Sequence, residues 1–434
     1  MRLLISPLVA MYLAMPSASS LAGEVLKLQQ AINLARSHSP AIKKQQAAGQ
    51  AQSNHAASAW ADTGPRGQVA YNWVRFQDQQ IASFGPAPLV VRPQETRAGS
   101  FTLSQPLTGF YALMQMARIE GIKKDVAENT AQLTDTLTAF ATAELYIRAQ
   151  QLAAMSTLSQ NRIAAGKAIQ KEGQALFRAG KIHKGDALKL DLVLSEAKSS
   201  AAKVTAQRDI LYATVKEQIG YGDQQMVTLP QIEAVSLPPL PEQKIAVEKA
   251  LLRRTEFHQA KRGVEIAKIG TLYSYSAYWP QVNAFAQWSR QYGELPFGQE
   301  AFTRTYGISA TWDIWDNGSR LFKTREVTEV LLQTEYELTE VQRKIKLEVI
   351  ESIANLQAAR ETVSLAKGAL EQATEAHRIE SSRFRAGSSR ASELVLSEAA
   401  EANAESNWIS AIADVQSQQY KLQRVQGDAA PTVL

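Results

Sequence analysis

Cysteine is absent from the 434 residues of this chain. The protein therefore has no disulfide framework, no thiolate metal ligand, no thiol redox chemistry and no N-terminal cysteine to carry a lipid anchor. An excess of one charge is also missing, because 47 basic and 42 acidic residues are interspersed and leave a net charge of +5. This balance argues against a nucleic-acid-binding surface, so no nucleic-acid partner is expected.

Long apolar runs are missing except at the start of the chain. Residues 1–22 have the pattern of an export signal, with Arg2 before the apolar segment 3–15 and a small-residue cleavage site at 20–22. A membrane anchor is the weaker alternative, because the run is short and is broken by prolines. Beyond it no run of 18 apolar residues exists, so contact with a bilayer would not use a transmembrane helix.

Enzymatic motifs are missing as well. The chain has no glycine-rich phosphate loop, no Gly-x-Ser-x-Gly and no His-Glu-x-x-His. Its five histidines are scattered without metal-ligand spacing: His38, His55, His183, His258 and His377. The sequence thus predicts no catalytic residue, no cofactor and no metal site.

What the chain does contain is an internal repeat. Phe177-Arg178-Ala179-Gly180 recurs as Phe384-Arg385-Ala386-Gly387. In each copy an acid follows six residues after the glycine, as Asp186 and Glu393, and a second glycine follows 40 residues after the first, as Gly220 and Gly427. This match predicts duplication of a whole structural unit.

The repeat sets the expected domain boundaries. After the signal come a first repeat, a proline-rich linker that stops helix and strand, a second repeat and a short tail, at 23–220, 221–241, 242–427 and 428–434. Each repeat reads as a helix, a strand hairpin, a long helix, a tip and a further helix. We place the hairpins at about 68–105 and 281–312, the long helices at 107–177 and 315–384, and the tips at 178–186 and 385–393.

The two long helical stretches contain no proline. About 70 residues of α-helix make a rod of roughly 105 Å. Apolar residues recur every seven positions, as at Val126, Leu133 and Phe140, which predicts coiled-coil packing. In the second copy a four-residue step between Ile345 and Val349 interrupts this spacing. A generic helical bundle is the alternative on this feature alone.

The strand runs favour a membrane-spanning structure. Apolar and polar residues alternate over about ten residues, the length of a tilted strand that crosses a bilayer. Arg290 and Arg304 interrupt the apolar side near the turn, where they can snorkel. Aromatic residues near the strand ends fit a membrane interface: Trp73, Phe76, Phe101, Tyr292, Phe302 and Trp312. A half-buried soluble hairpin is the alternative.

Two hairpins supply four strands, which are too few to close a barrel in lipid. Three chains would supply twelve, an even number in the usual range. The predicted fold class is therefore mainly α with a small β part. It combines an antiparallel coiled-coil helical barrel with a transmembrane β-barrel of four strands per chain and twelve per trimer.

The chain resembles the TolC family of outer-membrane efflux channels over about residues 24–427. The resemblance rests on the opening helix 34–42, on the strand exits Leu103–Gly109 and Trp312–Gly318, and on the paired tips. It implies a homotrimer in the outer membrane with a periplasmic extension, in contact with outer-membrane lipid and without catalytic chemistry.

The resemblance also implies partners. A periplasmic adaptor (membrane fusion) protein and an inner-membrane pump or ABC exporter would dock at the inner end. The chain would then be the passive exit duct of a tripartite efflux pump or a type I secretion system. A soluble periplasmic coiled-coil adaptor or scaffold is the alternative, although no lipoyl-like domain is visible. The sequence does not identify the exported substrate.

In that family the tips form a periplasmic gate, in which an aspartate of the first tip bonds a tyrosine and an arginine of the second. Asp186 matches the aspartate, but Phe384 stands at the tyrosine position and Ser389 at the arginine position, followed by Arg390. Glu393 represents a nearby acidic ring. We therefore expect a looser or differently bonded closure that uses Asp186 and Arg390.

The same tips are the expected docking site for the adaptor, through Arg178, Gly180, Lys181, Arg385 and Gly387. The alternative is that most of this motif only caps a helix hairpin and has no docking role. Glycine closes a helix in the left-handed conformation, arginine favours the negative end of the helix dipole, and an acid favours the positive end of the next helix.

Overall fold

The computed structural model describes residues 25–83, 88–222, 228–233, 239–293 and 300–432. The predicted export signal lies outside these residues. The chain divides into two compact units. The tip unit comprises Met1–Ala35, Leu145–Ala234 and Ala366–Ala413, and the sheet unit comprises Arg36–Glu144, Val235–Leu365 and Asp414–Leu434.

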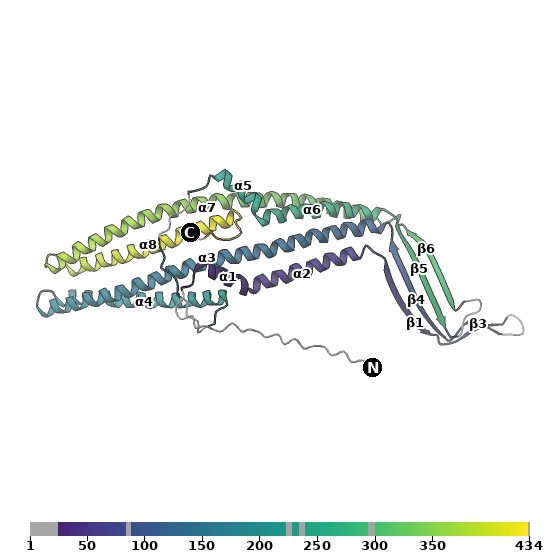
Figure 1. Cartoon of the computed structure of the whole chain (residues 1–434), viewed down its shortest axis with the longest axis horizontal. Coiled ribbons are helices and arrows are strands. Elements are labelled where there is room, and N and C mark those ends of the chain that lie inside the picture. The colour runs from purple at the N-terminus through teal and green to yellow at the C-terminus, as the bar shows by residue number, and fades with distance from the viewer. Residues whose placement is uncertain (1–24, 84–87, 223–227, 234–238, 294–299, 433–434) are drawn as a thin grey trace, which may run out of the picture. The chain divides into compact units, whose positions relative to one another are not determined.

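Both copies contain two opening helices where the sequence predicts one, then an antiparallel pair of long strands, a long helix and a further helix (Figure 1). The first copy contains α1 (Leu28–His38), α2 (Pro40–Ala61), β1 (Arg66–Arg75), β2 (Gln80–Ser83), β3 (Pro88–Arg92), β4 (Glu95–Pro106), α3 (Gly109–Arg178) and α4 (Lys184–Ile219). The second contains α5 (Gln243–Arg253), α6 (Thr255–Tyr275), a 3-10 turn (Ser276–Tyr278), β5 (Gln281–Tyr292), β6 (Phe302–Thr311), α7 (Ser319–Arg385) and α8 (Ala391–Val425). The fold is mainly helical with a small sheet, as expected.

The long helices α3 and α7 have 70 and 67 residues. Helix α7 begins four residues later than its sequence predicts, because Asn317 and Gly318 have φ angles of 54° and 83°. The carboxylate of Asp316 accepts hydrogen bonds from the backbone N–H groups of Gly318 and Arg320. This cap satisfies donors that the first turn of a helix leaves free and fixes the start of α7.

The sheet has the strand order β1-β4-β5-β6, with every neighbouring pair antiparallel. The β4–β5 pairing joins the two repeats. One row of the register runs through Val69, Phe101, Trp288 and Arg304. The short strands β2 and β3 form a separate hairpin between β1 and β4, for which the sequence shows no pattern.

Each unit has its own buried contacts. In the sheet unit, Ile345, Val349 and Leu356 of α7 are fully buried against α5 and α8. The four-residue step of the heptad pattern therefore keeps Ile345 and Val349 on the buried face. In the tip unit, Gly166 and Gly173 of α3 lie against Leu194 and Leu190 of α4, so the two helices approach closely.

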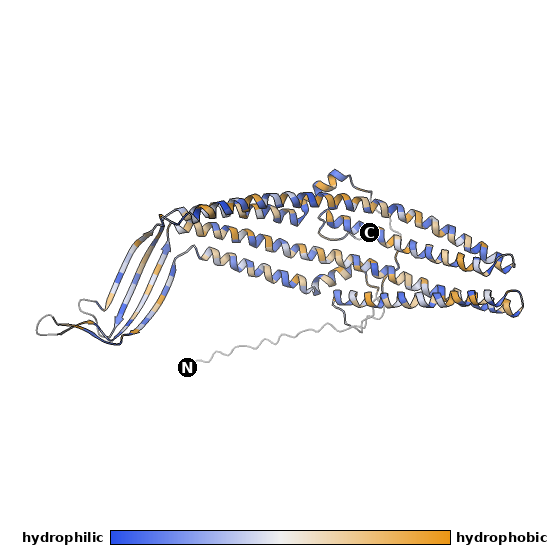
Figure 2. Cartoon of the chain, turned by 180° about the vertical axis from the view of Figure 1, so that it is seen from behind, coloured by the Kyte–Doolittle hydropathy of each residue, from blue (hydrophilic) through white to orange (hydrophobic). Residues whose placement is uncertain are grey.

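Apolar and polar residues are mixed along the helices and strands (Figure 2). Among the helices that the structure describes, none has both the length and the apolar character that crossing a lipid bilayer requires.

Candidate functional site: the sheet faces and the paired tips

One face of the four-stranded sheet is apolar. The register places Val69, Phe101 and Trp288 side by side on this face, and the rings of Phe101 and Trp288 lie 5.6 Å apart. On the outer strand β6, Tyr306 and Ile308 share this face and are 85% and 69% exposed. Val69, Phe101 and Trp288 are 80%, 42% and 37% exposed, so the described chain leaves much of this apolar face uncovered.

The opposite face is mainly polar. It carries Gln68, Asn72, Ser100, Thr102, Asn283, Gln287, Ser289, Thr303, Thr305 and Ser309. Phe285 is the large exception. It pairs with Gly307, and a Cβ on Gly307 would lie 3.3 Å from the Phe285 ring, so the glycine makes room for it. The alternation predicted from the sequence thus separates an apolar face from a polar face.

Arginines of the apolar face lie toward the end of the sheet where β5 ends at Tyr292 and β6 begins at Phe302, which we call the hairpin end. Arg290 lies over the ring of Tyr292 at 5.2 Å, and Arg304 lies over Phe302 at 5.1 Å. Arg97 pairs with Glu95 at 2.8 Å. The side chains that interrupt the apolar pattern are therefore held at one end, on neighbouring aromatic rings or a carboxylate.

The aromatic residues predicted for a membrane interface occupy three levels of the sheet. Trp73, Phe76, Tyr292 and Phe302 lie at the hairpin end, Phe101 in the middle and Trp312 at the helix end. The indole of Trp73 donates to Glu95, and Arg92 lies over Phe76 at 4.4 Å. The hairpin end therefore contains four of the six predicted residues.

A second group of aromatic residues lies at the helix end of the sheet, where the strands meet the helices, and the sequence pattern does not predict it. Trp279 contacts Tyr111 with 5.4 Å between ring centroids, and Tyr278 accepts a hydrogen bond from Trp312 through its carbonyl at 3.2 Å. Trp315 is 83% exposed. These residues belong to helix starts and turns, so the alternation of the strands gives no signal for them.

The two tips have the same turn geometry. Gly180 and Gly387 have φ angles of 69° and 76°. In the first tip Lys181 N–H donates to Leu176 C=O at 2.9 Å, and in the second Ser388 N–H donates to Arg383 C=O at 2.9 Å. This is the Schellman closure of a helix, in which the left-handed residue is glycine because it has no Cβ.

The tips also pack on each other within the tip unit. Phe384 of α7 is buried with Leu190 of α4 and with Ala391 and Leu394 of α8. Phe177, its counterpart in the first tip, is 43% exposed. Phe384 therefore joins the two hairpins by apolar packing, where the family tyrosine would form a hydrogen bond.

The polar gate candidates are held mainly within their own tips. Asp186 pairs with Lys189 of the same helix at 3.5 Å. The Ser389 hydroxyl lies between Glu380 and Glu393, and its hydrogen bond holds the pKa of Glu393 below the ordinary value. In the part of the chain that the structure describes, no ion pair joins Asp186 to Arg390.

The candidate docking residues lie around the two turns. Arg178 donates to the carbonyl of Gln174 at 3.3 Å, and Gly180, Lys181 and Gly387 are exposed. Arg385 reaches across to Glu172 of α3 at 3.5 Å and adds an ion pair between the tips. The two turns thus expose backbone groups and basic side chains, and the hairpins below them are joined by apolar packing.

Replacing Phe384 with alanine is expected to loosen the tips from each other. A buried phenylalanine truncated to alanine costs about 3–5 kcal/mol. Phe177→Ala is the matched control, because this exposed residue holds the same motif position, and it is expected to cost far less. Native-state hydrogen exchange of the tip amides measures both. Equal protection in the two variants would show that Phe384 packing does not join the tips.

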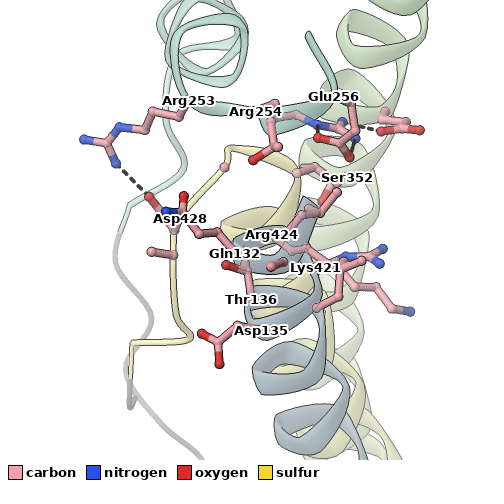
Figure 3. A pocket seen from close by; sticks show the side chains of 18 of the residues that line it. Gln132, Asp135, Thr136, Arg253, Arg254, Glu256, Ser352, Lys421, Arg424 and Asp428 are labelled. Atoms are coloured by element: carbon pink, nitrogen blue, oxygen red, sulfur yellow. Dashed lines mark hydrogen bonds and ion pairs between the residues drawn. The ribbon is translucent and has the colours of Figure 1, made fainter. Parts of the chain in front are cut away.

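A cavity of about 840 Å³ in the sheet unit is lined by residues of α3, α5, α7 and α8 (Figure 3). Several of its charged side chains form ion pairs within the cavity. Arg253 contacts Asp428 at 2.9 Å, and Arg254 contacts Glu256 and Glu348. Burial alone would raise the pKa of Glu256, but hydrogen bonds from Arg254 lower it. These groups compensate one another's charge, so we assign the cavity no ligand.

The second glycine of the repeat, Gly427, lies beside this cavity at a position that has no room for a side chain. Its φ angle is 79°, and a Cβ there would lie 2.8 Å from Cβ of Arg253. The next residue, Asp428, binds Lys249 and Arg253. The glycine therefore turns the chain at the end of α8 so that the following residues are tied to α5.

Comparison with known proteins gives a consistent result. Residues 246–428 match the family model described as outer membrane efflux protein. No relative was found among curated protein sequences.

Solved structures extend the similarity over most of the chain. The outer membrane protein VceC of Vibrio cholerae is 14% identical, with a TM-score of 0.80 over 92% of this chain and 96% of that one. The Campylobacter jejuni outer membrane channel CmeC is 11% identical, with a TM-score of 0.81 over 94% and 90%. The Neisseria gonorrhoeae outer membrane channel MtrE is 14% identical, with a TM-score of 0.77 over 92% and 88%. The resemblance stated from the sequence is thus confirmed, by sequence in the second repeat and by fold over most of the chain.

Proposed function

We propose that this chain, whose residues 246–428 match outer membrane efflux proteins and whose fold is that of solved outer-membrane channels, forms a trimeric duct through the outer membrane. The trimer continues as a helical tunnel in the periplasm. It is the passive exit of a tripartite efflux pump or a type I secretion system. The adaptor and the inner-membrane pump or exporter select the cargo.

The sheet carries this proposal. It has four strands, an exposed apolar face, a polar face and two outer strands, β1 and β6, whose outer edges pair with no described strand. An open edge is not tolerated in lipid, because its backbone groups would lack partners. Three copies close a ring of twelve strands with the apolar face toward lipid and the polar face toward water.

The alternative of a soluble adaptor explains the sheet less well. A soluble sheet would bury its apolar face against another layer. Here Tyr306 and Val69 are 85% and 80% exposed, and the arginines of this face lie at one end. Such a surface suits lipid and its polar boundary.

Conductance in planar bilayers tests the duct and its gate together. The purified protein is expected to form pores that are mostly closed. Since Asp186 pairs within its own helix, we propose that the closing contact to Arg390 forms between neighbouring chains. Asp186→Ala and Arg390→Ala are then expected to raise the closed-state current several-fold, whereas Lys198→Ala, an exposed charge on α4, is not.

Two outcomes would contradict these proposals separately. A protein that inserts but never conducts would refute the duct. Conducting pores whose closed-state current is unchanged by both Asp186→Ala and Arg390→Ala would keep the duct and refute the gate.

A further inference from the structure

A mixed cluster of one histidine and several carboxylates lies in the tip unit. His377 of α7 faces Glu398 and Glu401 of α8, which are three residues apart and so share one helix face. One ligand atom from each of the three residues lies within 4.8 Å of the others. Neither the duct nor the gate uses these residues.

The spacing of these atoms fits a small divalent ion. Nε2 of His377 lies 3.4 Å from Oε2 of Glu398 and 4.0 Å from Oε2 of Glu401. Two ligands at the usual zinc distances in a tetrahedral site lie about 3.4 Å apart. The His377–Glu398 pair already has this separation, and a small rotation of the Glu401 side chain would give the His377–Glu401 pair the same separation.

Hydrogen bonding orients the imidazole for such a role. The Ser397 hydroxyl donates its only hydrogen to the carbonyl of Leu394 at 2.8 Å. At its 3.2 Å contact with Nδ1 of His377, the hydroxyl therefore acts as the acceptor, and Nδ1 carries the hydrogen. In the neutral ring, Nε2 then directs a lone pair at two carboxylates. That arrangement is repulsive unless Nε2 is protonated or a metal ion lies between the ring and the carboxylates. An outer hydrogen bond on Nδ1 of this kind is usual for ligating histidines.

The excess of carboxylates around this cluster also favours binding of a cation. Arg162 of α3 donates to Glu398 at 2.8 Å and to Glu405 at 2.9 Å, and it lies 3.8 Å from Glu401. Among the described residues, Arg162 and His377 are the only cationic partners of these three carboxylates. When the imidazole is neutral, the single guanidinium of Arg162 leaves two of the three carboxylate charges uncompensated, and the side chains of Glu398 and Glu401 are only 9% and 19% exposed. Uncompensated charge at such a depth is costly.

We propose that His377, Glu398 and Glu401 bind one divalent transition-metal ion of the zinc type per chain. An imidazole nitrogen with two carboxylate oxygens suits zinc and its neighbours rather than calcium or magnesium. The ion ties α7 to α8, and through the Glu398–Arg162 pair it also holds α3. This proposal is independent of the duct, because it concerns packing within one chain.

The test uses the full-length protein in detergent, without a histidine tag and stripped of metal by a chelator. Zn²⁺ is expected to bind once per chain and to raise the unfolding temperature. Co²⁺ is expected to give visible absorption that Zn²⁺ removes, and millimolar Ca²⁺ or Mg²⁺ is not expected to compete. His377→Ala and Glu401→Gln are each expected to weaken Zn²⁺ binding at least roughly tenfold.

Two controls separate ligation from general effects. His183→Ala removes an exposed histidine of the same unit, and Glu405→Gln removes a carboxylate of the cluster that is not a proposed ligand. Both are expected to keep the Zn²⁺ affinity within a few-fold. The proposal is overturned if the unsubstituted protein binds no stoichiometric Zn²⁺, or if His377→Ala binds it equally well. Stabilisation by acid alone, without metal binding, would instead assign the missing positive charge to a proton.

Discussion

Tyr306→Lys is expected to prevent the chain from assembling in the outer membrane, whereas Thr305→Lys is expected to be tolerated. The two residues are neighbours near the middle of β6, but Tyr306 lies on the apolar face and Thr305 on the polar face. A lysine that faces lipid near the bilayer midplane costs about 2–4 kcal/mol. The cost is incurred three times in a trimer.

The measurement is the amount of trimer in the outer-membrane fraction for the two variants at equal expression. Thr305→Lys controls for the added charge and for the loss of strand propensity on the same strand. Equal amounts of trimer would show that the Tyr306 face does not meet lipid. Loss of trimer only in Thr305→Lys would show that the Thr305 face meets lipid and the Tyr306 face meets water.

Cysteines placed on the two outer strands are expected to link chains covalently. Four antiparallel strands leave β1 and β6 running in opposite directions, so β6 of one copy can pair with β1 of the next and continue the alternation. Side chains opposite each other across such a pair lie close enough for a disulfide. Since the chain has no cysteine, every crosslink reports the introduced pair.

The experiment combines Ala70→Cys on β1 with a scan of Thr303→Cys, Thr305→Cys and Ser309→Cys on β6. All four positions lie on the polar face. At least one combination is expected to give, after oxidation, a covalent species of three chains. Thr102→Cys in place of Ala70→Cys is the control, because β4 is paired on both sides. Crosslinks that stop at two chains, or that form equally well from Thr102, would refute the pairing of β6 with β1.

Local rules predicted much of this fold because both copies obey them. The glycines of the two tips have left-handed φ angles, as do Gly220 and Gly427. The period of two in β5 and β6 correctly separated Tyr306 and Trp288 from Thr305 and Gln287. These features depend on residues that are close in sequence, so a single sequence shows them.

Contacts between distant segments were not predictable in this way. The repeat treats Phe177 and Phe384 alike, yet only Phe384 is buried, because Leu190 of α4 packs against it. The scattered histidines gave no metal-ligand spacing, and the turn between α7 and α8 brings His377 beside Glu398. The hairpin of β2 and β3 is too short to show a period.

Imaging single particles of the unsubstituted protein, extracted from the outer membrane in detergent, tests the shared barrel most directly. The expected particle has threefold symmetry and a closed ring of twelve strands, in which β6 of each copy pairs with β1 of its neighbour. A stable monomer, or an assembly in which β1 and β6 stay unpaired, would contradict it.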